Sequence, residues 1–437
     1  MSEPGVHLRQ ASTKANLIDL RRTLCKRHKG RSCLTGAERA SIEVEAPVRI
    51  AADVLIGILV LFSVRRLLWV MASWLRRRTP TEAGRWPEVL IAVAFRNEQD
   101  SLPRLLSGID ALSYDAERLS ICLVDDASTD ASTGLAVAWA RERANVRLII
   151  LDENVGKAEA LNRALASAAG RPEVMVVYDA DQCPRPDSLR RLIEPFADSR
   201  TEAVCGYRRP VFRKINAIVA YGCLEAWTHQ LVNLSAKEAL GLDPPTMGGN
   251  CAYRRSAVER IGGFPAGSFS EDTEVSLALA GSGGRTRFVR DAVADHAVAD
   301  SFRDYFNQRL RWSRGLMASR RHVRGLEAAF VAAGYLDRVV LLLVAACILG
   351  GYVSPWWIVV YAVPAVTAVV AAVVKAHPEP RLACTVFAVI PVMFVVDVAV
   401  SVLAILHGVT GSRLRWMDRR SAGSSTADVT EPHDLRF

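Results

Sequence analysis

Apolar and polar residues alternate in two different ways along this chain, and the change falls near residue 85. From Pro87 onward, short runs rich in Val and Ile alternate with amphipathic segments, which is typical of buried strands and the helices that cover them. The runs predict parallel strands over 89–95, 120–124, 146–151 and 174–178. The segments between them predict helices over 100–112, 130–143 and 157–169. This order predicts right-handed crossovers and a doubly wound α/β sheet.

Longer apolar stretches on both sides of this region predict membrane-spanning helices. The first covers residues 48–68, with Arg65 and Arg66 near enough to one end to reach the headgroups. A helix lying on the membrane surface is the alternative. Three further spans are predicted over 339–353, 356–374 and 382–406, and Trp356 and Trp357 suit an interfacial aromatic belt.

The remaining segments complete the predicted organisation. Residues 215–240 predict one long helix, and the basic, amphipathic residues 301–326 suit a helix at the membrane surface. We expect a basic tail over 1–47 that is disordered or at most a surface helix, followed by a membrane segment over 48–75. An α/β domain over 85–300 comes next, and then an interfacial helix over 301–330. About three membrane helices over 335–409 and a tail over 410–437 complete the chain.

The charge of the chain is concentrated beside the apolar stretches. The formal net charge is +9, and basic clusters lie before residue 48 and at 76–78, where they suit contact with anionic lipid headgroups. No aromatic residues interleave with these charges, which argues against nucleic acid as a partner. The nine cysteines form no Cys-x-x-Cys pair, so we expect reduced, buried thiols in a cytosolic compartment. No cleavable signal peptide is expected, because the first forty-odd residues lack an apolar core.

Acidic residues follow two of the predicted strands, at the edge where such sheets bind ligands. Asp179 and Asp181 flank one small residue and predict a site for Mg²⁺ or Mn²⁺, with a strand-end turn as the alternative. Asp125 or Asp126 could accept a hydrogen bond from a uracil N–H or a ribose hydroxyl, whereas Ser128 or Asp130 would cap the next helix. Lys157 could lie near a nucleotide or remain solvated.

Two further signatures lie downstream. Ser270 precedes Glu271 and Asp272, which are expected to open a helix; Asp272 is the candidate general base and Glu271 a candidate substrate contact, with pure helix capping as the alternative. Four residues of the interfacial helix could contact substrate, Arg by clamping a diphosphate and Trp by stacking on a sugar: Gln308, Arg309, Arg311 and Trp312. Anchoring to lipid is their alternative role.

A carboxylate also stands inside the last apolar stretch. Asp397 is costly at that position, so it should line a path for a polymer or pair with a buried donor. Taken together, metal-binding carboxylates, a base, cations and an aromatic ring suit transfer of a sugar from a nucleotide.

The set of motifs resembles membrane-embedded glycosyltransferase family 2, the group of the cellulose, hyaluronan and poly-N-acetylglucosamine synthases. The resemblance is carried by residues 92–98, 124–130, 154–162, 179–181, 248–255, 270–272 and 308–312. It implies an α/β GT-A (Rossmann-like) catalytic domain plus α-helical transmembrane segments. It also implies a UDP-sugar donor, Mg²⁺ or Mn²⁺, inversion to a beta linkage, and elongation of a saccharide that is extruded through the membrane.

The resemblance further implies a multi-pass protein of the plasma membrane with its catalytic domain in the cytoplasm, and it allows accessory export or regulatory subunits. One alternative is a non-processive transferase that glycosylates a lipid, and another is an inactive, transferase-like membrane interaction protein. Three C-terminal spans would place Arg413, Arg415, Arg419 and Arg420 outside the cell, against the positive-inside rule. Either one span is re-entrant or this tail is an exception.

Overall fold

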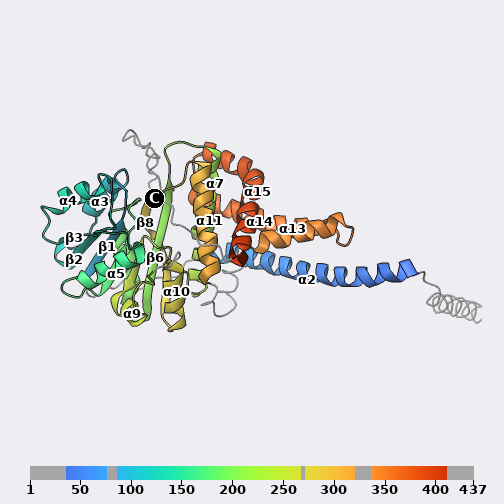
Figure 1. Cartoon of the computed structure of the whole chain (residues 1–437), viewed down its shortest axis with the longest axis horizontal. Coiled ribbons are helices and arrows are strands. Elements are labelled where there is room, and N and C mark those ends of the chain that lie inside the picture. Colours follow the sequence, from blue (N-terminus) through green and yellow to red (C-terminus); the bar gives the residue numbers. More distant parts are fainter. Residues whose placement is uncertain (1–35, 76–85, 267–270, 320–335, 411–437) are drawn as a thin grey trace, which may run out of the picture. The chain divides into compact units, whose positions relative to one another are not determined.

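The structure, a computed structural model, describes residues 36–75, 86–266, 271–319 and 336–410 (Figure 1). Predictions that concern residues 1–35, Ser270, 320–330 and 411–437 therefore lie outside the described residues. The chain divides into two compact units, residues 1–58 with 343–357 and residues 59–342 with 358–437. The second unit contains the α/β domain and every site discussed below.

Four parallel strands form the half of the sheet that the apolar runs predict. They are β1 (Val89–Phe95), β2 (Leu119–Asp125), β3 (Val146–Ile150) and β4 (Val174–Val177), in the spatial order β3-β2-β1-β4. The parallel sheet is therefore confirmed. Residues of β1 are buried on both faces, which explains why these strands read as continuous apolar runs rather than as alternating ones.

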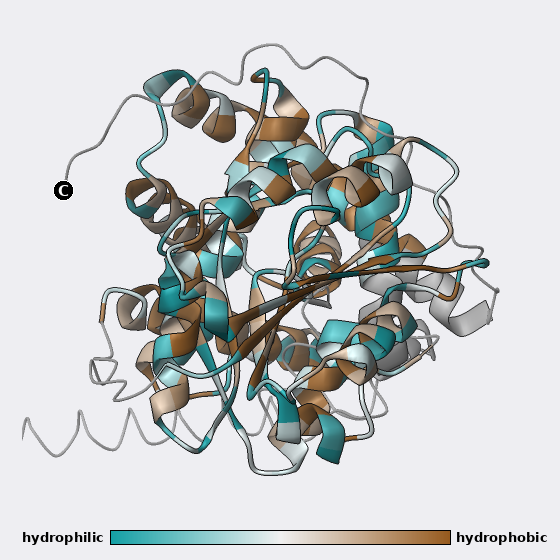
Figure 2. Cartoon of the chain, turned by 90° about the vertical axis from the view of Figure 1, so that its left-hand side faces the viewer, coloured by the Kyte–Doolittle hydropathy of each residue, from teal (hydrophilic) through white to brown (hydrophobic). Residues whose placement is uncertain are grey.

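Helices cover both faces of this half-sheet, as Figure 2 shows with the apolar strands between them. Leu102 and Leu105 of α3 (Leu102–Asp110) and Ala136 of α4 (Ser132–Ala140) pack in one buried cluster. Leu161 of α5 (Lys157–Ser167) packs in the other, with Leu90. These three helices agree with the prediction, and a short 3₁₀ turn, η2 (Ala116–Arg118), precedes β2.

The second half of the sheet is not doubly wound. The sheet continues β4-β7-β6-β8-β5, with β5 (Gln182–Pro184), β6 (Thr201–Val211), β7 (Cys251–Arg254) and β8 (Arg285–Ala297). β7 runs antiparallel to both β4 and β6, and β5 runs antiparallel to β8. Because β7 pairs directly with β4, the loop before β7 lies beside the loop that follows β4. The helices of this half are α6 (Ser188–Ile193), η3 (Glu194–Ala197), α9 (Arg255–Arg260) and α10 (Glu271–Gly281).

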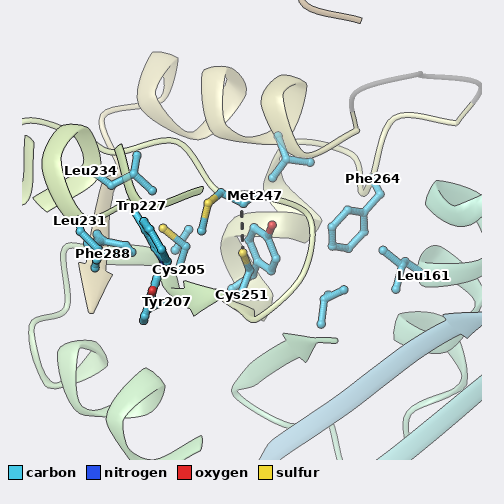
Figure 3. Packing of buried hydrophobic residues seen from close by; sticks show 14 of the residues in the cluster. Leu161, Cys205, Tyr207, Trp227, Leu231, Leu234, Met247, Cys251, Phe264 and Phe288 are labelled. Atoms are coloured by element: carbon cyan, nitrogen blue, oxygen red, sulfur yellow. Dashed lines mark hydrogen bonds between the residues drawn. The ribbon is translucent and has the colours of Figure 1, made fainter. Parts of the chain in front are cut away.

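The predicted helix over 215–240 is present but is interrupted by a wider turn. It consists of α7 (Ala217–Trp227), a π-helical segment η4 (Thr228–Leu234) and α8 (Ser235–Ala239). Figure 3 shows Trp227, Leu231 and Leu234 gathered with Phe288 of β8 and Cys205 of β6. This packing places the helix against the antiparallel half of the sheet.

Three helices in the described part of the chain are long and apolar enough to cross a membrane. They cover Pro47–Ala72, Trp356–Ala376 and Pro380–Val400, within α2 (Gly36–Ala72), α14 (Trp356–Ala376) and α15 (Pro380–Thr410). The first predicted C-terminal span forms α13 (Leu336–Leu349), which has 14 residues. From Gly36 onward, the predicted tail is helical.

The interfacial segment is helical as far as the structure describes it. α11 covers Phe302–Ser319 and contacts both α15 and α7. The helix that carries Gln308 to Trp312 is therefore packed against a candidate membrane span.

Candidate active site

Two loops at the carboxyl ends of β1 and β2 bind each other. Asn97 adopts φ +54°, and its Oδ1 accepts a hydrogen bond from Thr129 N at 2.8 Å, while its own N–H donates to Ser128 Oγ at 3.0 Å. Asp125 is fully buried; its carboxylate accepts from Ser128 N at 2.9 Å and from the hydroxyl of Thr133. These bonds hold the edge of the site in one shape.

Asp126 organises the turn that precedes α5. Its two carboxylate oxygens accept from Val155 N at 2.7 Å and from Gly156 N at 3.0 Å. Asp130 accepts from Ser132 N, the first N–H of α4, at 2.9 Å, although the N-cap position of α4 itself is Ala131. Each carboxylate oxygen has a second lone pair, so recognition of a nucleoside by Asp125 or Asp126 stays a prediction.

Lys157, the first residue of α5, joins the two acidic signatures. Its Nζ donates to Asp179 Oδ1 at 2.6 Å and to the carbonyl of Gly248 at 3.0 Å, and it pairs with Glu271 Oε1 at 3.1 Å. Burial alone would lower the pKa of Lys157, but the carboxylates of Asp179 and Glu271 outweigh burial and raise it. The amine therefore stays charged, and the Asp-x-Asp and Glu-Asp motifs lie within reach of one ammonium group.

Asp272 lies on the first turn of α10, beside this ammonium group. Its Oδ1 accepts from Thr273 N at 2.8 Å. Burial, together with the negative charge of Glu271, raises the pKa of Asp272 to about 6, and Lys157 opposes that rise. A carboxylate with this pKa is ionised at pH 7 yet more basic than an exposed Asp, which suits proton abstraction.

The glycines before β7 allow the loop to touch the acidic side chains. A Cβ on Gly249 would lie 2.2 Å from Asp179 Oδ2, and one on Gly248, at φ +78°, would lie 3.3 Å from Asp272 Oδ2. A side chain at Gly249 is therefore excluded while Asp179 keeps its position. A hydrogen bond joins the two ends of this loop: Met247 N donates to Cys251 Sγ at 3.4 Å (Figure 3).

The side chains nearest to the predicted metal site are the carboxylates of Asp179 and Asp181, with the imidazole of His296 beside Asp181. Asp179 Oδ2 accepts a long hydrogen bond from Gln182 Nε2, at 3.3 Å. Asp181 Oδ1 lies 3.4 Å from His296 Nδ1, which is buried and has no hydrogen-bond partner among the described residues. Within those residues no group of three or more His, Cys, Asp or Glu side chains converges. The set fits a Mg²⁺ or Mn²⁺ ion that takes its other ligands from phosphate and water.

The residues predicted on α11 have different surroundings. Arg309 is buried, pairs with Glu225 Oε2 at 2.5 Å, and lies over the rings of Tyr305 and Trp312 at 4.9 Å and 4.4 Å. Trp312 is 37% exposed, and Arg311 is also exposed while Gln308 is half-buried. Arg309 therefore connects α11 to α7 through Glu225, and α11 also touches α10.

Sequence reasoning did not single out four of these side chains: His296, Glu225, Tyr305 and Tyr221. His296 lies opposite Gln182 in the β5–β8 pairing, and antiparallel pairing between distant segments leaves no local signal. Asp397, by contrast, was expected to pair with a buried donor or to line a path. It accepts a hydrogen bond from Tyr221 OH at 2.6 Å, so the pairing is present.

One known protein family matches part of this chain. The family described as Glycosyl transferase family 2 matches residues 90–262. Over 233 residues the chain is 26% identical to the probable glycosyltransferase YdaM of Bacillus subtilis (strain 168), covering 52% of this chain and 55% of that protein. Over 299 residues it is 27% identical to cellulose synthase 2 of Novacetimonas hansenii, covering 63% of this chain and 18% of that protein. The chain thus spans about half of the first relative and less of the second.

Comparison with solved structures identifies the fold. The mannosyltransferase PcManGT from Pyrobaculum calidifontis, solved in complex with GDP-Man and Mn²⁺, is 22% identical with a TM-score of 0.60, and the match covers 84% of this chain and 99% of that chain. At this identity the likeness shows the fold alone, an α/β GT-A domain. The predicted fold class is confirmed, and the described part of the chain also holds three helices that are long and apolar enough to cross a membrane.

Proposed function

We propose a specific reaction for this chain, whose residues 90–262 match the family described as Glycosyl transferase family 2. The protein transfers a sugar from a UDP-sugar to a growing saccharide at a membrane, with inversion and with a divalent metal. The observation that carries the proposal is the contact of Lys157 with both Asp179 and Glu271. It gathers a metal-binding acid, a cation for a diphosphate and the neighbouring base Asp272 at the ligand-binding edge of the sheet.

Asp272 acts as the general base. It takes the proton of the acceptor hydroxyl while that oxygen attacks the anomeric carbon from the face opposite the departing UDP. One carboxylate suffices, and no covalent intermediate is needed. The pKa of about 6 keeps Asp272 ionised near neutrality while leaving it basic enough to assist.

Asp179 and Asp181 would hold Mg²⁺ or Mn²⁺, with His296 beside Asp181, and the ion would neutralise charge on the diphosphate. Lys157 supplies a second positive charge to the same phosphates, because its ammonium already lies 2.6 Å from Asp179. Asp125 and Asp126 shape the loops that receive the nucleoside. Gly248 and Gly249 let the acceptor-side loop approach the acids closely.

The candidate spans support a simple membrane topology. Among the described residues, one candidate span precedes the catalytic domain, and two, Trp356–Ala376 and Pro380–Val400, follow it. With two following spans, the basic residues after 410 return to the side of the catalytic domain, in agreement with the positive-inside rule. Such a topology would avoid the conflict that three following spans create, and it would make the protein a multi-pass membrane protein whose catalytic domain faces the cytoplasm.

Elongation rather than a single transfer is supported by the position of Trp312. The ring is exposed on α11, a helix that contacts the last span, so a saccharide stacked on it would lie close to the membrane. The similarity to a cellulose synthase over 63% of this chain is consistent with polymer synthesis. A stacked terminal sugar would also be retained between successive additions.

The deciding experiment incubates the purified, membrane-reconstituted protein with a panel of radiolabelled UDP-sugars and with GDP-mannose. Product size is followed over time by gel electrophoresis and mass spectrometry, with Asp272→Asn as the inactive control. We expect one UDP-sugar to give a saccharide that lengthens with time. A product that stays a singly glycosylated lipid would refute elongation, use of GDP-mannose alone would refute the UDP donor, and no transfer from any donor would refute the enzyme.

A further inference from the structure

A second cluster of buried polar groups lies between α7, α11, α13 and α15. Its centre is Asp397, which is 5% exposed although it stands in the last apolar stretch. Asp397 Oδ2 accepts from Tyr221 OH at 2.6 Å and from an Arg338 guanidinium N–H at 3.0 Å. Asp397 Oδ1 accepts from Tyr305 OH at 3.0 Å. Four helices therefore converge on one carboxylate.

Tyr305 connects this carboxylate to a second one. Its hydroxyl lies 3.0 Å from Glu225 Oε2 as well as 3.0 Å from Asp397 Oδ1. A phenol has one hydrogen, so both contacts are strong hydrogen bonds only when one of the carboxyl groups is protonated and donates in turn. Burial raises the pKa of Glu225 to about 7 against the opposing charge of Arg309, so this carboxyl group exchanges a proton near neutral pH and pairs with Arg309 when it is ionised.

The cluster ends at the side chain proposed to hold the acceptor. Glu225 pairs with Arg309, and the guanidinium of Arg309 lies over the ring of Tyr305 and over the ring of Trp312. Arg309 is 9% exposed and Trp312 is 37% exposed, so a buried cation supports one side of an accessible ring. The orientation of Trp312 thus depends on Arg309, which depends in turn on Glu225 and Tyr305.

We propose that Glu225, Tyr305 and Asp397 are positioning residues that hold α11 against α7 and the membrane span α15, and thereby orient Trp312 toward the acceptor saccharide. The inference rests on the proposed function and names how its acceptor site is built. The groups that face Glu225 are Tyr305 and Arg309 of α11, Asp397 of α15 and Arg338 of α13. These groups contact one another on α7, α11, α13 and α15. We therefore expect that binding of the donor near Lys157 does not depend on Glu225, Tyr305 or Asp397.

The test uses the full-length protein in lipid nanodiscs and compares Glu225→Ala, Glu225→Gln and Tyr305→Phe. The matched control is Glu259→Gln, which removes an exposed carboxylate of α9 that pairs with Arg255. Affinity for UDP with Mg²⁺ is measured by calorimetry. KM for an added oligosaccharide of the product, kcat and product length are measured with the UDP-sugar that the wild type uses.

We expect Glu225→Ala to raise the KM for the oligosaccharide about tenfold and to shorten the product, because the charge of Arg309 loses its partner. UDP affinity should stay within about twofold of the wild-type value, since the donor site is untouched. Glu225→Gln keeps both a donor and an acceptor at this position, and it should restore most of the loss. Tyr305→Phe, which keeps the ring and removes only the shared hydroxyl, should raise the KM by a smaller factor.

Two outcomes would overturn the proposal. One is a KM and product length in Glu225→Ala that match those of Glu259→Gln; the other is a parallel loss of UDP affinity, which would indicate general destabilisation. If the alanine variant does not fold, Tyr305→Phe decides, and unchanged KM and product length in that variant refute the positioning role. Failure of the wild type to use any UDP-sugar would instead refute the proposed function itself, so the two failures remain distinguishable.

Discussion

The ionisation of Asp272 gives the sharpest quantitative prediction. Its pKa is raised from 3.8 to about 6, first by burial and then by Glu271. A base works in its deprotonated form, so kcat/KM should rise with pH through about 6 and level off above it. From that pKa the ionised fraction is about 91% at pH 7 and about 9% at pH 5, which predicts roughly a tenfold fall in kcat/KM between these pH values.

A substitution at the neighbouring Glu271 removes one cause of the raised pKa of Asp272 and tests whether Asp272 is the base. Glu271→Gln removes the negative charge that raises the pKa of Asp272, so the midpoint of the profile should move to lower pH by about half a unit to one unit. Glu259→Gln serves as the control, because Glu259 lies on α9 and is exposed, and its profile should match that of the wild type. Asp272→Asn should lower turnover at least about a hundredfold at every pH while UDP binding persists.

The assay is initial-rate release of UDP between pH 5 and 8.5 at constant ionic strength and saturating Mg²⁺, with UDP affinity measured in parallel. The reasoning would be refuted by a wild-type profile with no inflection near pH 6, or by a midpoint that moves to higher pH in Glu271→Gln. Equal losses of UDP affinity and turnover in Asp272→Asn would point to helix capping instead of proton abstraction.

Three further predictions concern the rest of the site. Asp181→Asn should abolish transfer and weaken UDP binding in Mg²⁺ or Mn²⁺, as excess chelator should in the wild type, and full activity in chelator would contradict the metal role. Gly249→Ala should lose turnover with little change in melting temperature, because its Cβ would lie 2.2 Å from Asp179 Oδ2; wild-type activity would show that Asp179 can move freely. Trp312→Ala should shorten the product while UDP release continues, which gel sizing and a coupled UDP assay would check; a product of wild-type length would exclude stacking at Trp312.

Much of the parallel half of the sheet could be predicted because burial on both faces leaves a continuous apolar run. Val89–Phe95 and Val174–Val177 are examples. β8 could not be recognised in this way, since charged and apolar residues mix along Arg285–Ala297 and its partners β6 and β5 are distant in sequence. The three described helices that are long and apolar enough to cross a membrane followed from composition.

The sequence by itself determined the chemistry that the site can contain. The acids, Lys157 and the residues from Gln308 to Trp312 are recognisable from type and spacing, and the glycines at 248 and 249 from the resemblance. Only the tertiary structure decided which of them act on one another. Lys157 meets Asp179 and Glu271 because β4 ends and α10 begins at the same edge of the sheet. Arg309 pairs with Glu225, and Asp397 accepts hydrogen bonds from Tyr221 and Tyr305. Buried charged and polar groups require such partners, and no local sequence pattern identifies partners that lie far apart in the chain.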